Sequence, residues 1–132
     1  MIILDTNIVS YWMRGDEVIL NKLKNQKPSD LSISTITLAE ILYGIEKSPV
    51  KKKLRRDRIE AICSQLDIYP FDQDAARKYA TIRSHLEKKG IPISERDLQI
   101  ASIAVANQFR LITHNTKGFS RVPKLIVEDW KK

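Results

Sequence analysis

Cysteine, glycine and proline are scarce in this sequence of 132 residues, and each scarcity excludes a class of structure. The single cysteine, Cys63, cannot form an internal disulfide, and its apolar neighbours at helical spacing favour a packed hydrophobe over a nucleophile. Four glycines and five prolines leave no flexible linker, internal repeat or low-complexity tract. We therefore expect one compact domain over residues 1–132.

Long apolar runs are also missing. Every apolar stretch is far shorter than the roughly 20 residues that a membrane-spanning helix requires. The N-terminus lacks the basic, apolar and small-residue succession of a signal peptide. We expect no membrane association and a cytoplasmic location.

Short strand patterns alternate with helical patterns along the chain. Apolar runs predict strands over 2–4, 31–36, 67–71, 110–113 and 125–127. Helical periodicity, caps and breakers predict helices over 5–14, 16–26, 38–45, 50–66, 73–89 and, capped by Ser94, to about residue 107. This alternation predicts an α/β fold with a short, mainly parallel sheet covered on both faces.

Three acidic residues stand where ordinary surface carboxylates are not expected. Asp5 follows the apolar run 1–4, and the carboxyl end of a buried strand is where open α/β sheets bind ligands. Asp97 shares a helix face with the apolar residues Ile100 and Ala101. Glu40 lies on a side of its helix that also carries a small residue, Gly44.

Each acid also has an ordinary structural explanation. Asp5 could cap a helix, and Asp97 could form a capping box with Ser94. Glu40 lies about 150° from an apolar stripe that we centre near Leu38 and Leu42, as a solvated surface residue would. If the fold brings the three carboxylates together, their repulsion requires a cation, and oxygen ligands favour Mg²⁺ or Mn²⁺.

Positive charge is concentrated in one segment. The formal net charge is +7, and residues 47–58 carry seven basic residues and one acid. Such a segment beside an acidic site suits a phosphodiester substrate, although a solvated helix face or a clustered acidic partner explains it nearly as well. The candidates for RNA contact in it are Lys51, Lys52, Lys53, Arg55 and Arg56.

Five short motifs together resemble one known family. They are Leu4-Asp5-Thr6-Asn7, Ala39-Glu40-Ile41 with Tyr43-Gly44, Asp97-Leu98-Gln99-Ile100-Ala101, Leu111-Ile112-Thr113-His114-Asn115 and Val127-Glu128-Asp129-Trp130. Each motif is weak alone, but their order and spacing over almost the whole chain resemble the PIN-domain family in its VapC-type toxin branch.

The resemblance implies a three-layer α/β/α sandwich and an endoribonuclease that depends on Mg²⁺ or Mn²⁺. It further implies a cognate VapB-type antitoxin as partner and a homodimer. Asp5, Glu40 and Asp97 match the acidic metal-site positions of the family. In the implied mechanism, metal held by these residues activates a water for in-line attack on an RNA phosphodiester.

The sequence departs from the family pattern near its C-terminal end. Asn115 stands where many PIN domains have a fourth acid, and Gly118 also lacks a carboxylate found in some relatives. One tightly held metal is therefore the safer expectation than two. We expect supporting roles for Thr6, Asn7, Thr113 and Asn115, and Arg96 could contact phosphate.

Two other classes of protein compete with the nuclease. Aspartyl phosphatases also begin with an apolar strand that ends in Asp, but they need a second Asp where this chain has Asn7. A non-catalytic PIN-fold module would bind RNA or protein through the basic segment and use the acids only as helix caps. The sequence does not identify the RNA, the bond that is cut or the antitoxin.

Overall fold

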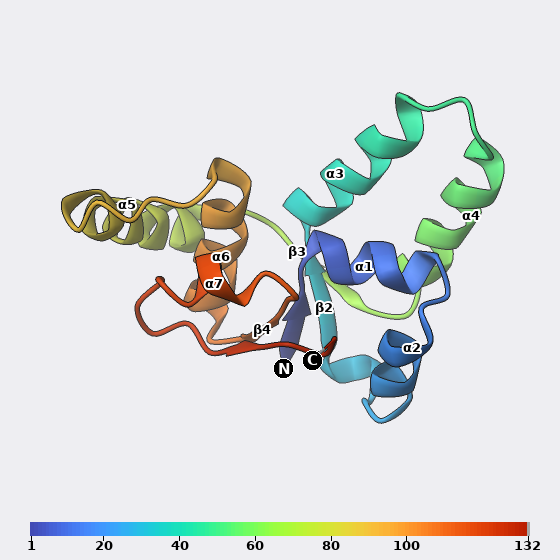
Figure 1. Ribbon diagram of the computed structural model, residues 1–132, viewed down its shortest axis with the longest axis horizontal. Helices are drawn as coiled ribbons and strands as arrows, with labels where there is room; N and C mark the ends of the chain where they lie inside the picture. The colour runs from blue at the N-terminus through green and yellow to red at the C-terminus, as the bar shows by residue number, and fades with distance from the viewer. Residues whose placement is uncertain (132) are drawn as a thin grey trace.

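Among residues 1–131, five parallel strands form the centre of the protein in the order β3-β2-β1-β4-β5, and seven α-helices connect or follow them (Figure 1). The computed structural model describes residues 1–131. The strands are β1 (Ile2–Leu4), β2 (Leu31–Ser34), β3 (Asp67–Tyr69), β4 (Arg110–Ile112) and β5 (Val127–Glu128). The helices are α1 (Thr6–Met13), α2 (Glu17–Lys24), α3 (Thr35–Glu46), α4 (Lys52–Cys63), α5 (Gln73–Lys88), α6 (Glu95–Asn107) and α7 (Thr116–Phe119).

The strand order places a topological switch point beside β1. The chain begins in the middle of the sheet, adds β2 and β3 on one side, and returns to add β4 and β5 on the other. Parallel crossovers are right-handed, so this change of direction sends the connecting helices to opposite faces. Helices α1 to α4 cover one face, and α5 to α7 lie on the other (Figure 1). Ligands of such sheets bind beyond the strand ends at the switch point, between β1 and β4.

The alternation of side chains along the strands divides the apolar core into two parts. Ile2 and Leu4 of β1 pack with the first helices, whereas Ile3 packs with α5 and α6. On β4, Ile112 faces the first cluster and Leu111 the second. The sheet is therefore buried on both faces, and the predicted α/β/α sandwich is confirmed.

Most predicted elements are present with shorter bounds. The strand predicted over 31–36 ends at Ser34, because the Ser34 hydroxyl accepts a hydrogen bond from the Thr37 N–H and so begins α3. The strand predicted over 67–71 ends at Tyr69, and Asp72 caps the helix that follows. The last strand lies at Val127–Glu128 rather than at 125–127. The short helix α7 was not predicted, since four residues hold too little periodicity to detect.

Two further predictions concern the packing of Cys63 and the lack of a helix that could span a membrane. Cys63 is half-buried against the first core cluster, and burial raises the pKa of its thiol, so it has the character of a packed side chain. Within residues 1–131, none of the helices is both long and apolar enough to cross a membrane.

Candidate active site

Asp5 occupies the end of the central strand and begins the first helix. The residue is only 3% exposed. One carboxylate oxygen accepts a hydrogen bond from the Ile8 N–H at 3.0 Å, which makes Asp5 the N-cap of α1. The other oxygen accepts a hydrogen bond from the Thr113 hydroxyl, at the end of β4. The helix-capping explanation is therefore correct for one oxygen, while Thr113 holds the other at the switch point between β1 and β4.

Asp97 reaches the same edge of the sheet from the first turn of α6. The Ser94 hydroxyl accepts a hydrogen bond from the Asp97 N–H at 3.3 Å, so the cap predicted for this helix is present. The Asp97 side chain is half-buried, and one of its oxygens faces the Asn115 amide nitrogen at 3.5 Å. Ile100 and Ala101, one turn along the helix, are fully packed in the core, as the helical wheel predicted.

The environment of Glu40 differs from the prediction, because helix α3 buries a different face than expected. The buried face of this helix is centred on Thr37, Ile41 and Ile45, whereas Leu42 is 44% exposed. The stripe that we centred near Leu38 and Leu42 is therefore displaced by about one residue. Glu40 then borders the buried face, and its side chain is only 21% exposed.

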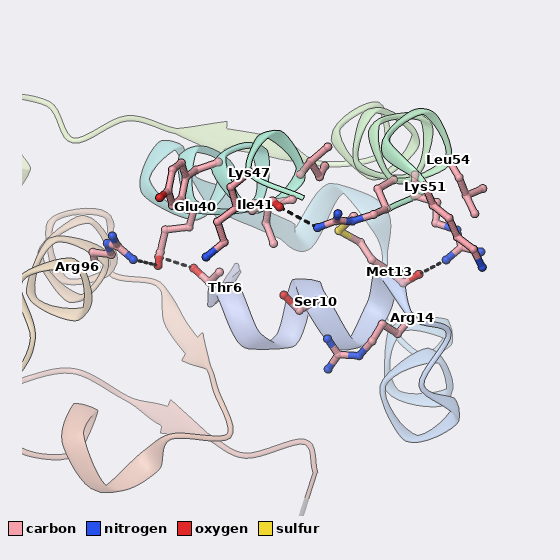
Figure 2. A pocket seen from close by; sticks show the side chains of 15 residues that line it. Thr6, Ser10, Met13, Arg14, Glu40, Ile41, Lys47, Lys51, Leu54 and Arg96 are labelled. Carbon is pink, nitrogen blue, oxygen red and sulfur yellow. Dashed lines mark hydrogen bonds and ion pairs between the residues drawn. The ribbon is translucent and has the colours of Figure 1, made fainter. Parts of the chain in front are cut away.

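The Glu40 carboxylate has a partner on each oxygen. Oε1 accepts a hydrogen bond from the Thr6 hydroxyl at 2.8 Å, and Oε2 lies 3.1 Å from Nη1 of Arg96 (Figure 2). Thr6 is also 3.1 Å from the hydroxyl of buried Thr37, which fixes the position of the Thr6 side chain. The site thus joins the starts of α1 and α6 to the middle of α3.

Asp97 interacts electrostatically with each of the other two carboxylates, those of Asp5 and Glu40. Burial, supported by the negative charge of Asp97, raises the pKa of Asp5 to about 6, and the hydrogen bonds from Thr113 and Ile8 oppose the rise. Burial also raises the pKa of Asp97, with Glu40 adding to the rise and the Ser94 hydroxyl opposing it. Desolvated acids that repel one another are stabilised by a cation, and their oxygens suit Mg²⁺ or Mn²⁺. The donor set therefore fits a hard divalent metal in chemical type.

In this structure the three acids of the candidate site do not form a complete set of metal ligands. Among residues 1–131, no three His, Cys, Asp or Glu side chains are close enough together to make a metal-holding group. The side chain of Glu40 is held by Thr6 and Arg96, so its position reflects those contacts. Metal uptake by all three carboxylates would require Glu40 to change partners.

The other predicted supporting residues lie at unequal distances from the acids. Thr113 is completely buried and contacts Asp5, whereas the Asn7 side chain is exposed and its backbone N–H faces Asp5. Asn115 is exposed beside Asp97, and its N–H donates to the Thr113 hydroxyl at 2.9 Å. A Cβ at Gly118 would lie 3.5 Å from the Asn115 amide, in ordinary contact.

A groove of about 520 Å³ extends from Thr6 and Glu40 between α1, α3 and α4 (Figure 2). Apolar side chains such as Met13, Ile41 and Leu54 line part of it. Glu40 is the one acid among its described lining residues. The cations that line it are Arg14, Lys47, Lys51, Arg55, Arg58 and Arg96.

The structure separates the basic residues that were proposed to contact RNA. Arg55 donates to the Gly44 carbonyl at 3.1 Å and to the Val50 carbonyl at 3.3 Å, which fixes the turn between α3 and α4. Lys52 and Arg56 both lie near Glu46, at 3.9 Å and 2.6 Å. Lys53 pairs with Asp57 at 3.1 Å and does not line the groove. Lys51 and Arg96 do line it, and sequence reasoning missed Arg14, whose position depends on the packing of α1 against α4.

Comparison with known families and proteins finds relatives that match almost the whole chain. The family described as PIN domain matches residues 2–125. Ribonuclease VapC2 of Rickettsia felis is 39% identical over 131 residues, which cover 98% of this chain and 97% of that protein. The tRNA(fMet)-specific endonuclease VapC of Shigella flexneri is 33% identical over 127 residues, covering 96% of each.

Solved structures with this fold include two VapBC complexes bound to DNA. VapBC2 from Rickettsia felis, bound to a DNA fragment from its promoter, contains a chain with a TM-score of 0.88 and 38% identity, covering 98% of this chain and 99% of that one. DNA-bound VapBC from Salmonella typhimurium contains a chain with a TM-score of 0.91 and 32% identity, with coverage of 98% and 99%.

Proposed function

The chain belongs to the PIN-domain family, and from this membership we propose that it is a metal-dependent endoribonuclease of the VapC type, the toxin of a VapBC pair. The observation that supports the metal dependence is the meeting of Asp5 and Asp97 at the switch point of the sheet, with Glu40 beside Asp97. Asp5 is almost fully buried there, and the charges of Asp97 and Glu40 act on one another beside it.

Asp5, Asp97 and Glu40 are the residues that would hold the metal. A bound Mg²⁺ or Mn²⁺ supplies a Lewis acid that activates water and offsets the charge that develops on the phosphate. The Thr113 hydroxyl holds the Asp5 carboxylate in place and opposes the burial that favours its protonated form. Ser94 orients Asp97 by beginning the helix directly before it.

The cationic groove is the surface that we propose for RNA on the way to these acids. It starts at Glu40 and Thr6, and the cations along it can neutralise backbone phosphates. One relative is named as specific for tRNA(fMet), which makes initiator tRNA the first single substrate to test. A cognate VapB-type antitoxin that covers this groove would keep RNA from the acids.

RNA cleavage tests the proposal directly. Purified protein is incubated with total RNA, and separately with initiator tRNA, in Mg²⁺, Mn²⁺ or EDTA. We expect cleavage with metal that is lost in Asp5→Asn and Asp97→Asn and retained in Asp67→Asn, which changes an exposed acid on β3. Circular dichroism is the control that each variant is folded.

The opposite result would favour the alternative, a non-catalytic PIN-fold module that binds RNA or protein. In that case no metal supports cleavage, and RNA binding is equal in the wild type and in both site variants. The acids would then serve as helix caps, which Asp5 already does with one oxygen.

A further inference from the structure

Arg96 holds one of the three candidate metal ligands from within the chain. Its guanidinium lies 3.1 Å from Oε2 of Glu40, across 56 residues of sequence. The Arg96 side chain is 65% exposed, whereas that of Glu40 is 21% exposed, so the arginine reaches inward from the surface to a sheltered acid. Figure 2 shows this contact continuing through Glu40 to Thr6.

The contact lies where the site needs positive charge. Glu40 repels Asp97, the residue that directly follows Arg96 in the sequence. A guanidinium that pairs with Glu40 reduces this repulsion without any metal, because a charge-assisted hydrogen bond is stronger than a neutral one. Arg96 therefore supplies part of the neutralisation that a divalent cation would otherwise provide.

Both partners of Glu40 restrict where its carboxylate can go. Thr6 holds Oε1 at 2.8 Å and Arg96 holds Oε2, and within residues 1–131 Glu40 forms no metal-holding group with the other acids. A cation that takes Glu40 as a ligand therefore competes with Arg96 for this carboxylate, because the two positive charges repel each other. The freed guanidinium would stay at the groove, which Arg96 also lines.

We propose that Arg96 is a positioning residue that competes with the divalent metal for Glu40, so that metal binding and release of the Arg96 side chain are coupled. This inference rests on the proposed metal-dependent function. It predicts that the chain binds metal more weakly than its carboxylates alone would allow, and that each metal ion taken up frees one cation beside the substrate groove.

Mn²⁺ binding, followed by electron paramagnetic resonance of the free ion, tests the competition without RNA. We expect Arg96→Gln to lower the Mn²⁺ dissociation constant about two- to fivefold, the range that corresponds to the loss of one exposed ion pair. Arg77→Gln is the matched control. The Arg77 side chain is also 65% exposed and lies 3.1 Å from a carboxylate, that of Asp74, but it lies on α5 outside the groove.

A double-mutant cycle separates the ion pair from a general effect of positive charge. In a Glu40→Gln background, Arg96→Gln should change the Mn²⁺ dissociation constant by less than in the wild type, because no pair exists to break. An effect of equal size in both backgrounds would overturn the proposal, since the arginine would then act on the whole site through its field.

Glu40→Gln removes a candidate metal ligand, so its Mn²⁺ binding could be too weak to measure. Thermal unfolding of the wild type and Arg96→Gln provides a second readout that does not require that variant. Without metal, Arg96→Gln should melt below the wild type, and saturating Mn²⁺ should narrow this difference, because the metal replaces the lost arginine. A difference that is unchanged by Mn²⁺ would contradict competition.

The outcomes distinguish this inference from the proposed function. Mn²⁺ binding that depends on Asp5 and Asp97 but is the same in wild type and Arg96→Gln, or weaker in the variant, would overturn the role of Arg96 alone. Wild-type protein that shows no Mn²⁺ binding dependent on Asp5 and Asp97 would overturn both.

Discussion

The hydroxyl of Thr113 donates a hydrogen bond to the carboxylate of Asp5, joining two residues that are 108 positions apart in the sequence. The ionised carboxylate can only accept, so the hydroxyl donates to it, and the same hydroxyl oxygen accepts a hydrogen bond from the Asn115 N–H at 2.9 Å. The bond spans the seam between β1 and β4, where the strand order reverses. Together with the hydrogen bond from the Asp5 N–H to the Ile112 carbonyl at 3.0 Å, it joins the two halves of the sheet at the candidate site.

Replacing Thr113 should change the pH dependence of metal binding. The Thr113 hydroxyl lowers the pKa of Asp5 against the effect of burial, so Thr113→Val should raise that pKa above its present value of about 6. The pH at which Mn²⁺ binding reaches half its maximum should then move upward, whereas Thr113→Ser, which keeps the hydroxyl, should stay near the wild type. Titration of Mn²⁺ affinity between about pH 5 and 8 measures the shift. Equal midpoints for Val and Ser would contradict this role of the hydroxyl.

Replacing Asp5 should stabilise the metal-free protein while abolishing cleavage. Burial raises the Asp5 pKa from its ordinary 3.8 to about 6, so the folded state binds the proton more tightly than the unfolded state. The stability contributed by this group is therefore complete below about pH 4 and is lost as the pH rises through about 6. Two units of pKa correspond to roughly 3 kcal/mol.

Asp5→Asn carries no charge and avoids this loss. In EDTA at pH 8 we expect the variant to be more stable than the wild type by up to about 3 kcal/mol, with the difference shrinking toward pH 4. Urea denaturation of the variant and the wild type at pH 8 and at pH 4 measures the difference in unfolding free energy at each pH. A variant that is less stable at pH 8 would show that the hydrogen bonds of Asp5 outweigh its burial.

Adding an acid at Asn115 should strengthen metal binding. The Asn115 amide lies 3.5 Å from Asp97, so Asn115→Asp would place a fourth carboxylate in the site, next to Asp97. We expect tighter Mn²⁺ binding by about tenfold and a lower melting temperature without metal, because like charges close together are costly until a cation neutralises them. Asn107→Asp, on the distant end of α6, is the control. Mn²⁺ affinity that is unchanged in Asn115→Asp would place this residue outside the metal site.

Removing the cap of α6 should affect both stability and the site. Ser94→Ala removes the acceptor of the Asp97 N–H and should cost about 1 kcal/mol of unfolding free energy. Asp72→Ala, which removes the cap of α5, should cost a similar amount. Only Ser94→Ala should also weaken Mn²⁺ binding, since Ser94 caps α6 and Asp97 lies in the first turn of that helix. Similar losses of Mn²⁺ affinity in both variants would indicate a general effect of destabilisation.

Two neighbouring lysines should differ in their effect on RNA binding. Lys51 lines the groove, whereas the Lys53 side chain is 92% exposed and pairs with Asp57. In the inactive Asp5→Asn protein, Lys51→Gln should weaken RNA binding and reduce the slope of log affinity against log salt by about 0.7, as one lost phosphate contact does for single strands. Lys53→Gln should change neither. Equal effects of the two substitutions would mean that the segment acts only through its overall charge.

The sequence predicted the elements and the acids at their ends, because both follow from local patterns. An apolar run that stops at Asp5 and a helix that begins at Ser94 are visible in a few residues. Glu40 was placed less well, since its helix is rich in apolar residues on several sides and the buried face depends on packing against α1 and α6. The pairing of Arg96 with Glu40 had no local signal, because it depends on where two distant helices meet.

The basic segment shows the same limit. Its charge was counted correctly, but the sequence could not tell which cations point into the groove and which are held by Glu46 or Asp57. Those assignments depend on the turn that Arg55 fixes between α3 and α4. Charge patterns predict the presence of a basic surface, and tertiary contacts decide which part of it is available.

The central position of β1 has a consequence for synthesis on the ribosome. Strand β1 emerges before both of its neighbours, since β2 follows about 30 residues later and β4 begins only at Arg110. Until β4 is outside the ribosome, Asp5 has no Thr113 beside it and the edge of β1 is open. A nascent chain therefore lacks the complete site until β4 has emerged, and premature termination before residue 110 would release fragments without it.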